Sequence, residues 1–124
     1  MAQPSPAVAT PTRLYQGQPG TAEATIYTAP GYASGSPYQA GSTTIVKRVI
    51  VCNTTAAAAT LTLYLVPSGG TAGAANELLN ALSVAAGTTQ IMDLEQEMLP
   101  GDFLAALQSV AGALTVTISG ATFQ

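Results

Sequence analysis

Apolar and polar residues alternate along two stretches of the chain, a pattern that predicts half-buried β-strands. In residues 60–65, Leu61, Leu63 and Leu65 alternate with threonine and tyrosine. Residues 114–119 alternate leucine, valine and isoleucine with threonine and serine. Because successive side chains of a strand point to opposite faces, each stretch has one apolar and one polar face.

A third stretch, "TTIVKRVIVCN" at residues 43–53, is β-branched and almost continuously apolar. This composition is typical of a strand that is covered on both faces. In a regular strand Lys47 and Arg48 point to opposite faces, so we expect one cation near the edge of the core and the other towards a partner. The acidic strand at residues 93–97 is a candidate partner for this pair, in the same subunit or the next.

Turn residues divide the second half of the chain into short segments. Gly87, Pro100-Gly101 and Gly112 are separated by about a dozen residues, a spacing that indicates short strands joined by turns. The segment "NELLNALSVAA" at residues 76–86 also fits one or two helical turns. The pattern as a whole predicts an all-β fold, an antiparallel β-sandwich of the jelly-roll or immunoglobulin-like kind.

Proline sets the first part of the chain apart, since six of the eight prolines lie within the first 37 residues. Proline lacks an amide donor and fixes φ, which excludes a helix or a central strand there. We therefore expect an extended arm at residues 1–20 and one sandwich domain at residues 21–124. Within that domain, residues 31–41 are rich in glycine, serine and tyrosine and are predicted to form a loop.

Charged residues are unusually sparse. Three basic and six acidic residues make up 7% of the chain, against about 25% in an ordinary protein. Disorder is a poor explanation because 48% of the residues are hydrophobic. The composition instead predicts that partner subunits cover much of the surface.

Several classes of function are disfavoured by what the chain contains. A net charge of −3 argues against a nucleic-acid partner, and no apolar run approaches the ~18 residues of a membrane span. The first residues show no pattern of a secretory signal. Histidine is absent and Cys52 is the only cysteine, so imidazole catalysis and an internal disulfide are excluded. We expect no enzymatic activity and no cofactor.

Two groups of side chains remain as candidate sites. Asp93, Glu95 and Glu97 share one face of a strand and could bind Ca²⁺, although a solvated strand edge explains them more simply. Tyrosines favour interfaces but also pack on their own sheet, and both interpretations stay open for Tyr15 and for the two loop tyrosines. Cys52, within a run of valine and isoleucine, is interpreted as a small hydrophobic side chain.

Three stretches of the chain together resemble a known group of proteins: "TPTRLYQGQPGTAEATIYTAP", "TTIVKRVIVCNTTAAAATLTLYLVPSGGTAGAANELL" and "LPGDFLAALQSVAGALTVTISG". They are similar to small virion proteins encoded in the structural modules of tailed bacteriophages and prophages. The resemblance covers about residues 11–120 and contains no catalytic motif. It implies a small β-sandwich with a structural role on a head, tail or fibre, and residues 31–40 depart from it as an insertion.

Together these observations predict a capsid decoration (cement) protein located in the virion. We expect a homo-oligomer, most simply a trimer, that contacts the major capsid protein or other virion subunits and neither nucleic acid nor a membrane. The expected interface residues are Arg13, Tyr15, Tyr32, Tyr38, Lys47 and Arg48. The alternatives are a tail, baseplate or fibre-associated protein, or an adhesin that binds the host or a glycan.

Overall fold

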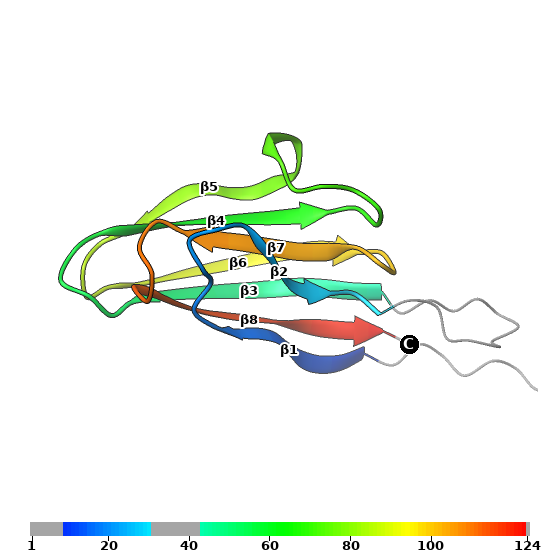
Figure 1. Cartoon of the computed structure of the whole chain (residues 1–124). Coiled ribbons are helices and arrows are strands. Elements are labelled where there is room, and N and C mark those ends of the chain that lie inside the picture. The colour runs from blue at the N-terminus through cyan, green and yellow to red at the C-terminus, as the bar shows by residue number, and fades with distance from the viewer. Residues whose placement is uncertain (1–8, 31–42, 124) are drawn as a thin grey trace, which may run out of the picture.

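A computed structural model describes residues 9–30 and 43–123 of the chain as a sandwich of β-strands (Figure 1). A 3-10 turn, η1 (Ala74–Asn76), precedes the fifth strand. No helix in the described part is long and apolar enough to cross a membrane. The strands are β1 (Ala9–Gly17), β2 (Ala24–Thr28), β3 (Thr43–Asn53), β4 (Ala59–Val66), β5 (Glu77–Val84), β6 (Thr89–Met98), β7 (Phe103–Gln108) and β8 (Leu114–Phe123).

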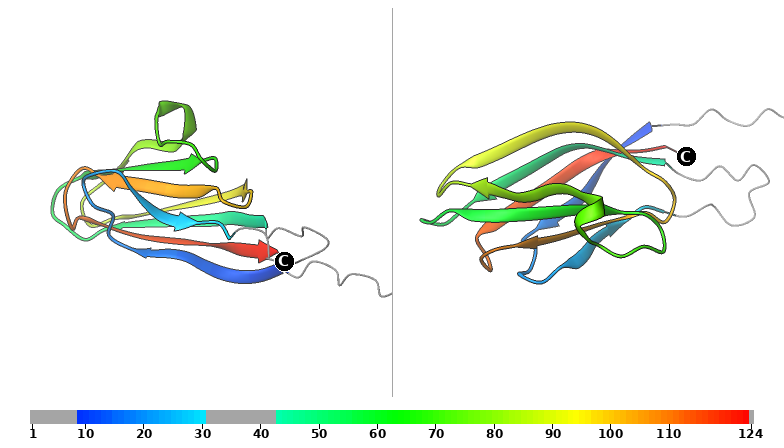
Figure 2. Two further views of the ribbon diagram at one scale, coloured as in Figure 1. Left: turned by 45° about the vertical axis from the view of Figure 1, so that its right-hand side comes forward. Right: turned by 90° about the horizontal axis from the view of Figure 1, so that it is seen from above.

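The strands form two four-stranded antiparallel sheets that pack face to face (Figure 2). Sheet A has the order β1-β8-β3-β6 and sheet B the order β2-β7-β4-β5. Two four-stranded sheets joined in this way form an eight-stranded jelly roll, whereas an immunoglobulin-like sandwich divides its strands differently. The prediction of an all-β sandwich is confirmed, and the strand order selects the jelly-roll form.

The core lies between the two sheets and follows the alternation read from the sequence. Leu61 and Leu63 of β4 face Val116 and Ile118 of β8, and all four are at most 1% exposed. Burying each of these side chains stabilises the fold by about 1.5–3 kcal/mol. The two alternating stretches therefore supply the facing layers of the core, one from each sheet.

Strand β1 occupies much of the segment that was expected to be an arm. Ala9–Gly17 pairs antiparallel with β8 and contributes the buried Leu14 to the core. Pro11 is compatible with this pairing because β1 lies at the edge of sheet A, where one side of the strand needs no ladder partner. The structure differs from the predicted arm over residues 9–17, while residues 1–8 and the predicted loop 31–41 lie outside the described residues.

Strand β5 resolves the ambiguity between helix and strand at residues 76–86. It pairs with β4, but its register shifts twice, and Ala81 adopts a positive φ of 47°. The Ala81 amide donates to Thr62 Oγ1 at 3.2 Å, which closes the bulge. Such irregularities bend a strand away from ideal pairing, so β5 is a distorted edge of sheet B.

A line of register shifts crosses sheet A at one level. Strand β1 shifts against β8 between Arg13 and Tyr15, and β3 shifts between Val46 and Arg48. The extra residue in β3 turns both of its cations to the solvent side, where each side chain is 51% exposed. The prediction that Lys47 and Arg48 point to opposite faces is therefore wrong, because it assumed a regular strand.

Candidate interaction surface

The outer face of sheet A is hollowed at the level of these register shifts. The hollow has a volume of about 670 Å³ and lies over β1 and β8, with Lys47 of β3 at its side. Its floor consists of small side chains and of Gly120, while Arg13 and Phe123 belong to its walls. We call this surface the sheet A hollow.

Gly120 explains why the two central strands can approach so closely there. A Cβ atom added to Gly120 would lie 1.9 Å from the carbonyl oxygen of Ile45, far inside van der Waals contact. Only a residue without a side chain fits at this point of the β3–β8 pair. Gly120 thus allows β3 and β8 to pair closely beside the hollow, at the level of the bulges.

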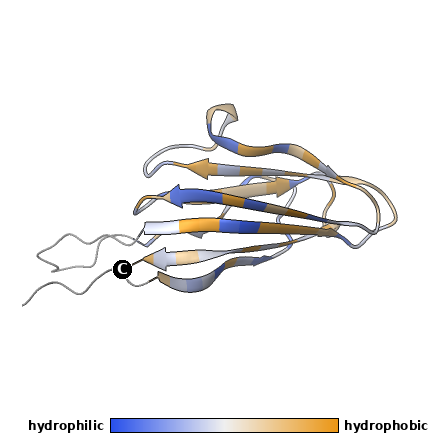
Figure 3. Cartoon of the chain, turned by 180° about the vertical axis from the view of Figure 1, so that it is seen from behind, coloured by the Kyte–Doolittle hydropathy of each residue, from blue (hydrophilic) through white to orange (hydrophobic). Residues whose placement is uncertain are grey.

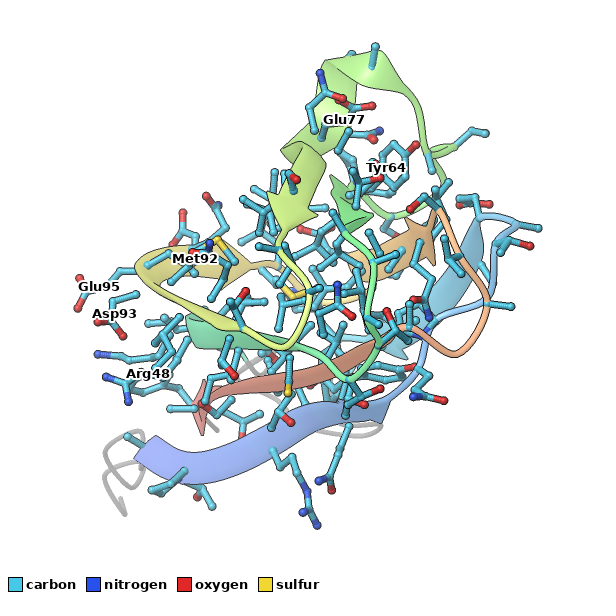
Figure 4. All side chains as sticks on the ribbon, turned by 90° about the vertical axis from the view of Figure 1, so that its left-hand side faces the viewer. Arg48, Tyr64, Glu77, Met92, Asp93 and Glu95 are labelled. Carbon is cyan, nitrogen blue, oxygen red and sulfur yellow. The ribbon has the colours of Figure 1, made fainter. Side chains whose placement is uncertain are left out.

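The basic residues gather on this side of the molecule. Arg48 Nε lies 2.7 Å from Asp93 Oδ1, and Lys47 Nζ lies 3.3 Å from Glu95 Oε1. Figure 4 shows Arg48, Asp93 and Glu95 projecting away from the sandwich, and Figure 3 shows the hydrophilic parts of β3 and β6 side by side. The proposed pairing of these cations with the acidic strand is present within one subunit.

Arg13 differs from the other two cations. Its Nη1 donates to Gln16 Oε1 at 2.9 Å, and within the described residues it forms no ion pair with a carboxylate. It therefore stands beside the sheet A hollow as a charge that a partner's carboxylate could neutralise. Of the expected interface residues, the structure brings together Arg13 and Lys47 at this hollow and places Arg48 next to Lys47 along β3.

The acidic residues separate into two groups. Asp93, Glu95 and Glu97 are exposed along β6, as expected for one face of a strand. Asp102 is buried, and its carboxylate accepts hydrogen bonds from the amides of Leu99 (2.9 Å) and Ser68 (3.0 Å). In residues 9–30 and 43–123 no group of three acidic or cysteine side chains is placed to hold a metal ion.

Of the aromatic and thiol candidates, the structure describes Tyr15 and Cys52. Tyr15 is partly buried against the core, and this burial raises the pKa of its phenol. Cys52 is half-buried at the end of β3, opposite Thr89 of β6. Tyr32 and Tyr38 lie outside the described residues.

A second opening lies between the edges of the two sheets. Strands β5 and β6 are the last strands of their sheets, and an apolar slot of about 260 Å³ opens between them. Figure 4 shows Met92 on the β5 side of β6. The slot, called the β5–β6 slot below, is lined by Val49, Leu63, Leu78, Leu79, Met92 and Leu94, with Asp93 at its rim.

Sequence reasoning missed both openings and the residues that form them. Phe123 and Ala121 reach the sheet A hollow only because β8 pairs with β1, more than 100 residues away in the chain. The one available signal was Gly120, a lone glycine in an alternating strand, which often marks a bulge or a close backbone approach.

Comparison with known proteins identifies a similarity of fold. No family model matches the chain, and no curated protein matches it. A structure of infectious bursal disease virus strain Gx is similar over 94% of this chain, with a TM-score of 0.57 and 16% identity. A mutant VP2 protein of the same virus, in derived T=1 particles, is similar over 94% of this chain, with a TM-score of 0.55 and 15% identity. The chain spans about a third of the length of these neighbours (32% and 31%), and at such low identity the likeness is one of fold.

Proposed function

We propose that this chain is a non-enzymatic structural protein of a virion, and specifically a decoration protein on the head of a tailed bacteriophage. The observation that carries the proposal is the jelly roll itself, which is similar in fold to VP2 in T=1 particles. The low content of charged residues, 7% of the chain, supports the same conclusion, because charged side chains are depleted in the buried centre of protein interfaces. The phage origin rests on the sequence resemblance, whereas the structural neighbours come from a different virus.

Adhesion through the sheet A hollow is the proposed mechanism. The floor of small side chains lets a segment of the shell approach the backbone of β1 and β8 closely. Arg13 would bind a carboxylate of that segment, which fixes its position. Each such contact is modest, but hundreds of copies on one shell sum to a large stabilisation.

Copy number in purified particles tests the proposal. Quantitative mass spectrometry against the major capsid protein should give hundreds of copies per virion for a decoration protein. A tail, baseplate or fibre protein would be present in about three to a dozen copies, as the symmetry of those structures requires. Absence of the chain from purified particles would contradict a virion role altogether.

The contact surface is tested separately in the same particles. Arg13→Glu should reduce the amount of the chain retained on the heads, because the substitution reverses the charge at the hollow. Glu23→Arg is the matched control, since Glu23 is an exposed carboxylate just before β2 in sheet B. Equal retention of both variants would show that the sheet A hollow is not the contact surface.

A further inference from the structure

The sandwich has four edge strands, and three of them are poorly suited to pair with another strand. Strand β1 contains Pro11 and a register shift, and β2 has five residues with a shift of its own. Strand β5 carries two shifts and the strained Ala81. Prolines, bulges and short length are the devices by which proteins prevent edge-to-edge association.

Strand β6 is protected along only half of its length. In residues 94–98, β6 carries a register shift of its own against β3, between Asp93 and Gln96, and Glu95 and Glu97 are exposed. The Gln96 side chain donates to the Glu97 carbonyl at 3.2 Å. The other half, residues 89–93, pairs with β3 in constant register and contains no proline. Its central residue is Ile91, which is 59% exposed and ranks with the large hydrophobic side chains left at the surface.

We propose that two copies of the chain associate about a two-fold axis through antiparallel pairing of β6 with β6 of the second copy. Ile91 lies at the axis, so that sheet A continues through the interface as eight strands. A second copy is the partner that fits, because two-fold pairing uses the same edge twice. A head-to-tail contact would need a second open edge, and β1, β2 and β5 do not offer one.

The charges of β6 favour this register. With Ile91 at the axis, Asp93 lies opposite Thr89 of the second copy, and no carboxylate faces another carboxylate. A shift that brings Asp93 to the axis would set two aspartates directly opposite each other, which is destabilising. Ile91 also lies beside Ile50 of β3, so the pairing joins these side chains into one apolar cluster on the outer face.

The β5–β6 slot supplies a second and independent reason for association. Met92 lines the slot and is adjacent in sequence to Ile91, so the slot lies next to the proposed axis. Pairing of two β6 strands therefore brings two apolar slots together and removes part of their lining from water. This burial adds to the hydrogen bonds of the new strand pair.

The right-hand view of Figure 2 shows β6 along one side of the sandwich, with no strand of the described chain beyond it. The proposal gives a dimer instead of the trimer expected from the sequence. It does not rest on the proposed function, because strand pairing depends on the isolated chain alone.

Sedimentation equilibrium of the purified full-length chain tests the proposal. At about 100 µM, well above a micromolar dissociation constant, the mass should be twice 12.4 kDa. Ile91→Lys should raise the dissociation constant at least about tenfold, since it removes the apolar contact and places two like charges across the axis. Leu99→Lys is the matched control, because Leu99 is 57% exposed but lies outside the paired segment. Circular dichroism should show that both variants are folded.

Crosslinking provides a measurement that does not depend on affinity. In a Cys52→Ser background, Ile91→Cys should form a disulfide-linked dimer under mild oxidation, because paired residues at a two-fold axis bring their Cβ atoms within about 5 Å. Leu99→Cys in the same background should remain monomeric on a non-reducing gel.

Three results of the sedimentation experiment would each overturn the proposal: a wild-type monomer at about 100 µM, a trimer, or a dimer that Ile91→Lys leaves unchanged. None of these results bears on the copy number in virions, so the two proposals fail separately.

Discussion

Gly120 is the residue on which the shape of sheet A depends most directly. A methyl group at this position would collide with the Ile45 carbonyl at 1.9 Å, and the nearest relief is separation of β3 from β8. We expect Gly120→Ala to lower the free energy of unfolding by about 1–3 kcal/mol or more, as overpacking of a tight site does. Urea denaturation followed by circular dichroism measures the change.

Gly73→Ala is the matched control for this substitution. Beyond its two chain neighbours, no residue has an atom within 4 Å of the position that a Cβ of Gly73 would occupy, and its φ of −172° is ordinary extended backbone. The control should change stability by less than about 0.5 kcal/mol. If Gly120→Ala is equally neutral, the close approach of β3 and β8 is not needed for stability.

At the scale of single elements, the sequence patterns predicted the positions of the strands better than they predicted which side chains face the core. The alternation in residues 60–65 and 114–119 predicted that Leu61, Leu63, Val116 and Ile118 face the core, whereas Leu65 is only partly buried. The prediction holds because the extra residues of the neighbouring bulges lie in β5, β1 and β3. The relative faces of Lys47 and Arg48 in β3 were predicted wrongly, since one extra residue reverses the face of every side chain that follows it. A bulge depends on the neighbouring strands, and the local sequence does not contain that information.

The ionic contacts between β3 and β6 show how much of the site could be predicted. Their existence was inferred from the composition of the two strands, while the bulge that places both cations on the outer side was not. The pairs are more than half exposed, so each contributes about 0.2–1 kcal/mol. We expect their larger role to be in fixing the register of the two strands.

Charge reversal tests this role. The double substitution Lys47→Glu with Arg48→Glu places like charges opposite Asp93 and Glu95 and should lower stability by about 1–2 kcal/mol at low salt. The loss should shrink in about 1 M salt, where screening is strong. Adding Asp93→Arg and Glu95→Lys restores opposite charges and should recover most of the stability in thermal denaturation. If the quadruple variant is no more stable than the double variant, the ion pairs do not fix the register.

At the scale of the whole molecule, the sandwich depends on contacts between distant parts of the chain. Strand β8 lies between β1 and β3, and this position joins the beginning of the described chain to its end. No local pattern predicts such pairings, so the sequence of residues 1–20 predicts an arm although residues 9–17 form β1. The prolines of this segment correctly exclude a central strand, but they are compatible with an edge strand such as β1.

Deletion of residues 1–17 distinguishes an integral strand from an arm. Loss of β1 would leave β8 as an unpaired edge and would remove the buried Leu14, so we expect the truncated chain to unfold or aggregate. Leu14→Ala provides the graded comparison: it keeps the strand but leaves a cavity that should lower stability by about 2–5 kcal/mol. Because the deletion loses the strand pairing as well as the side chain, its effect should exceed that of the point substitution. A truncated chain that unfolds in urea at the same midpoint as the full chain would show that β1 is dispensable. The segment would then behave as the arm that its prolines first suggested.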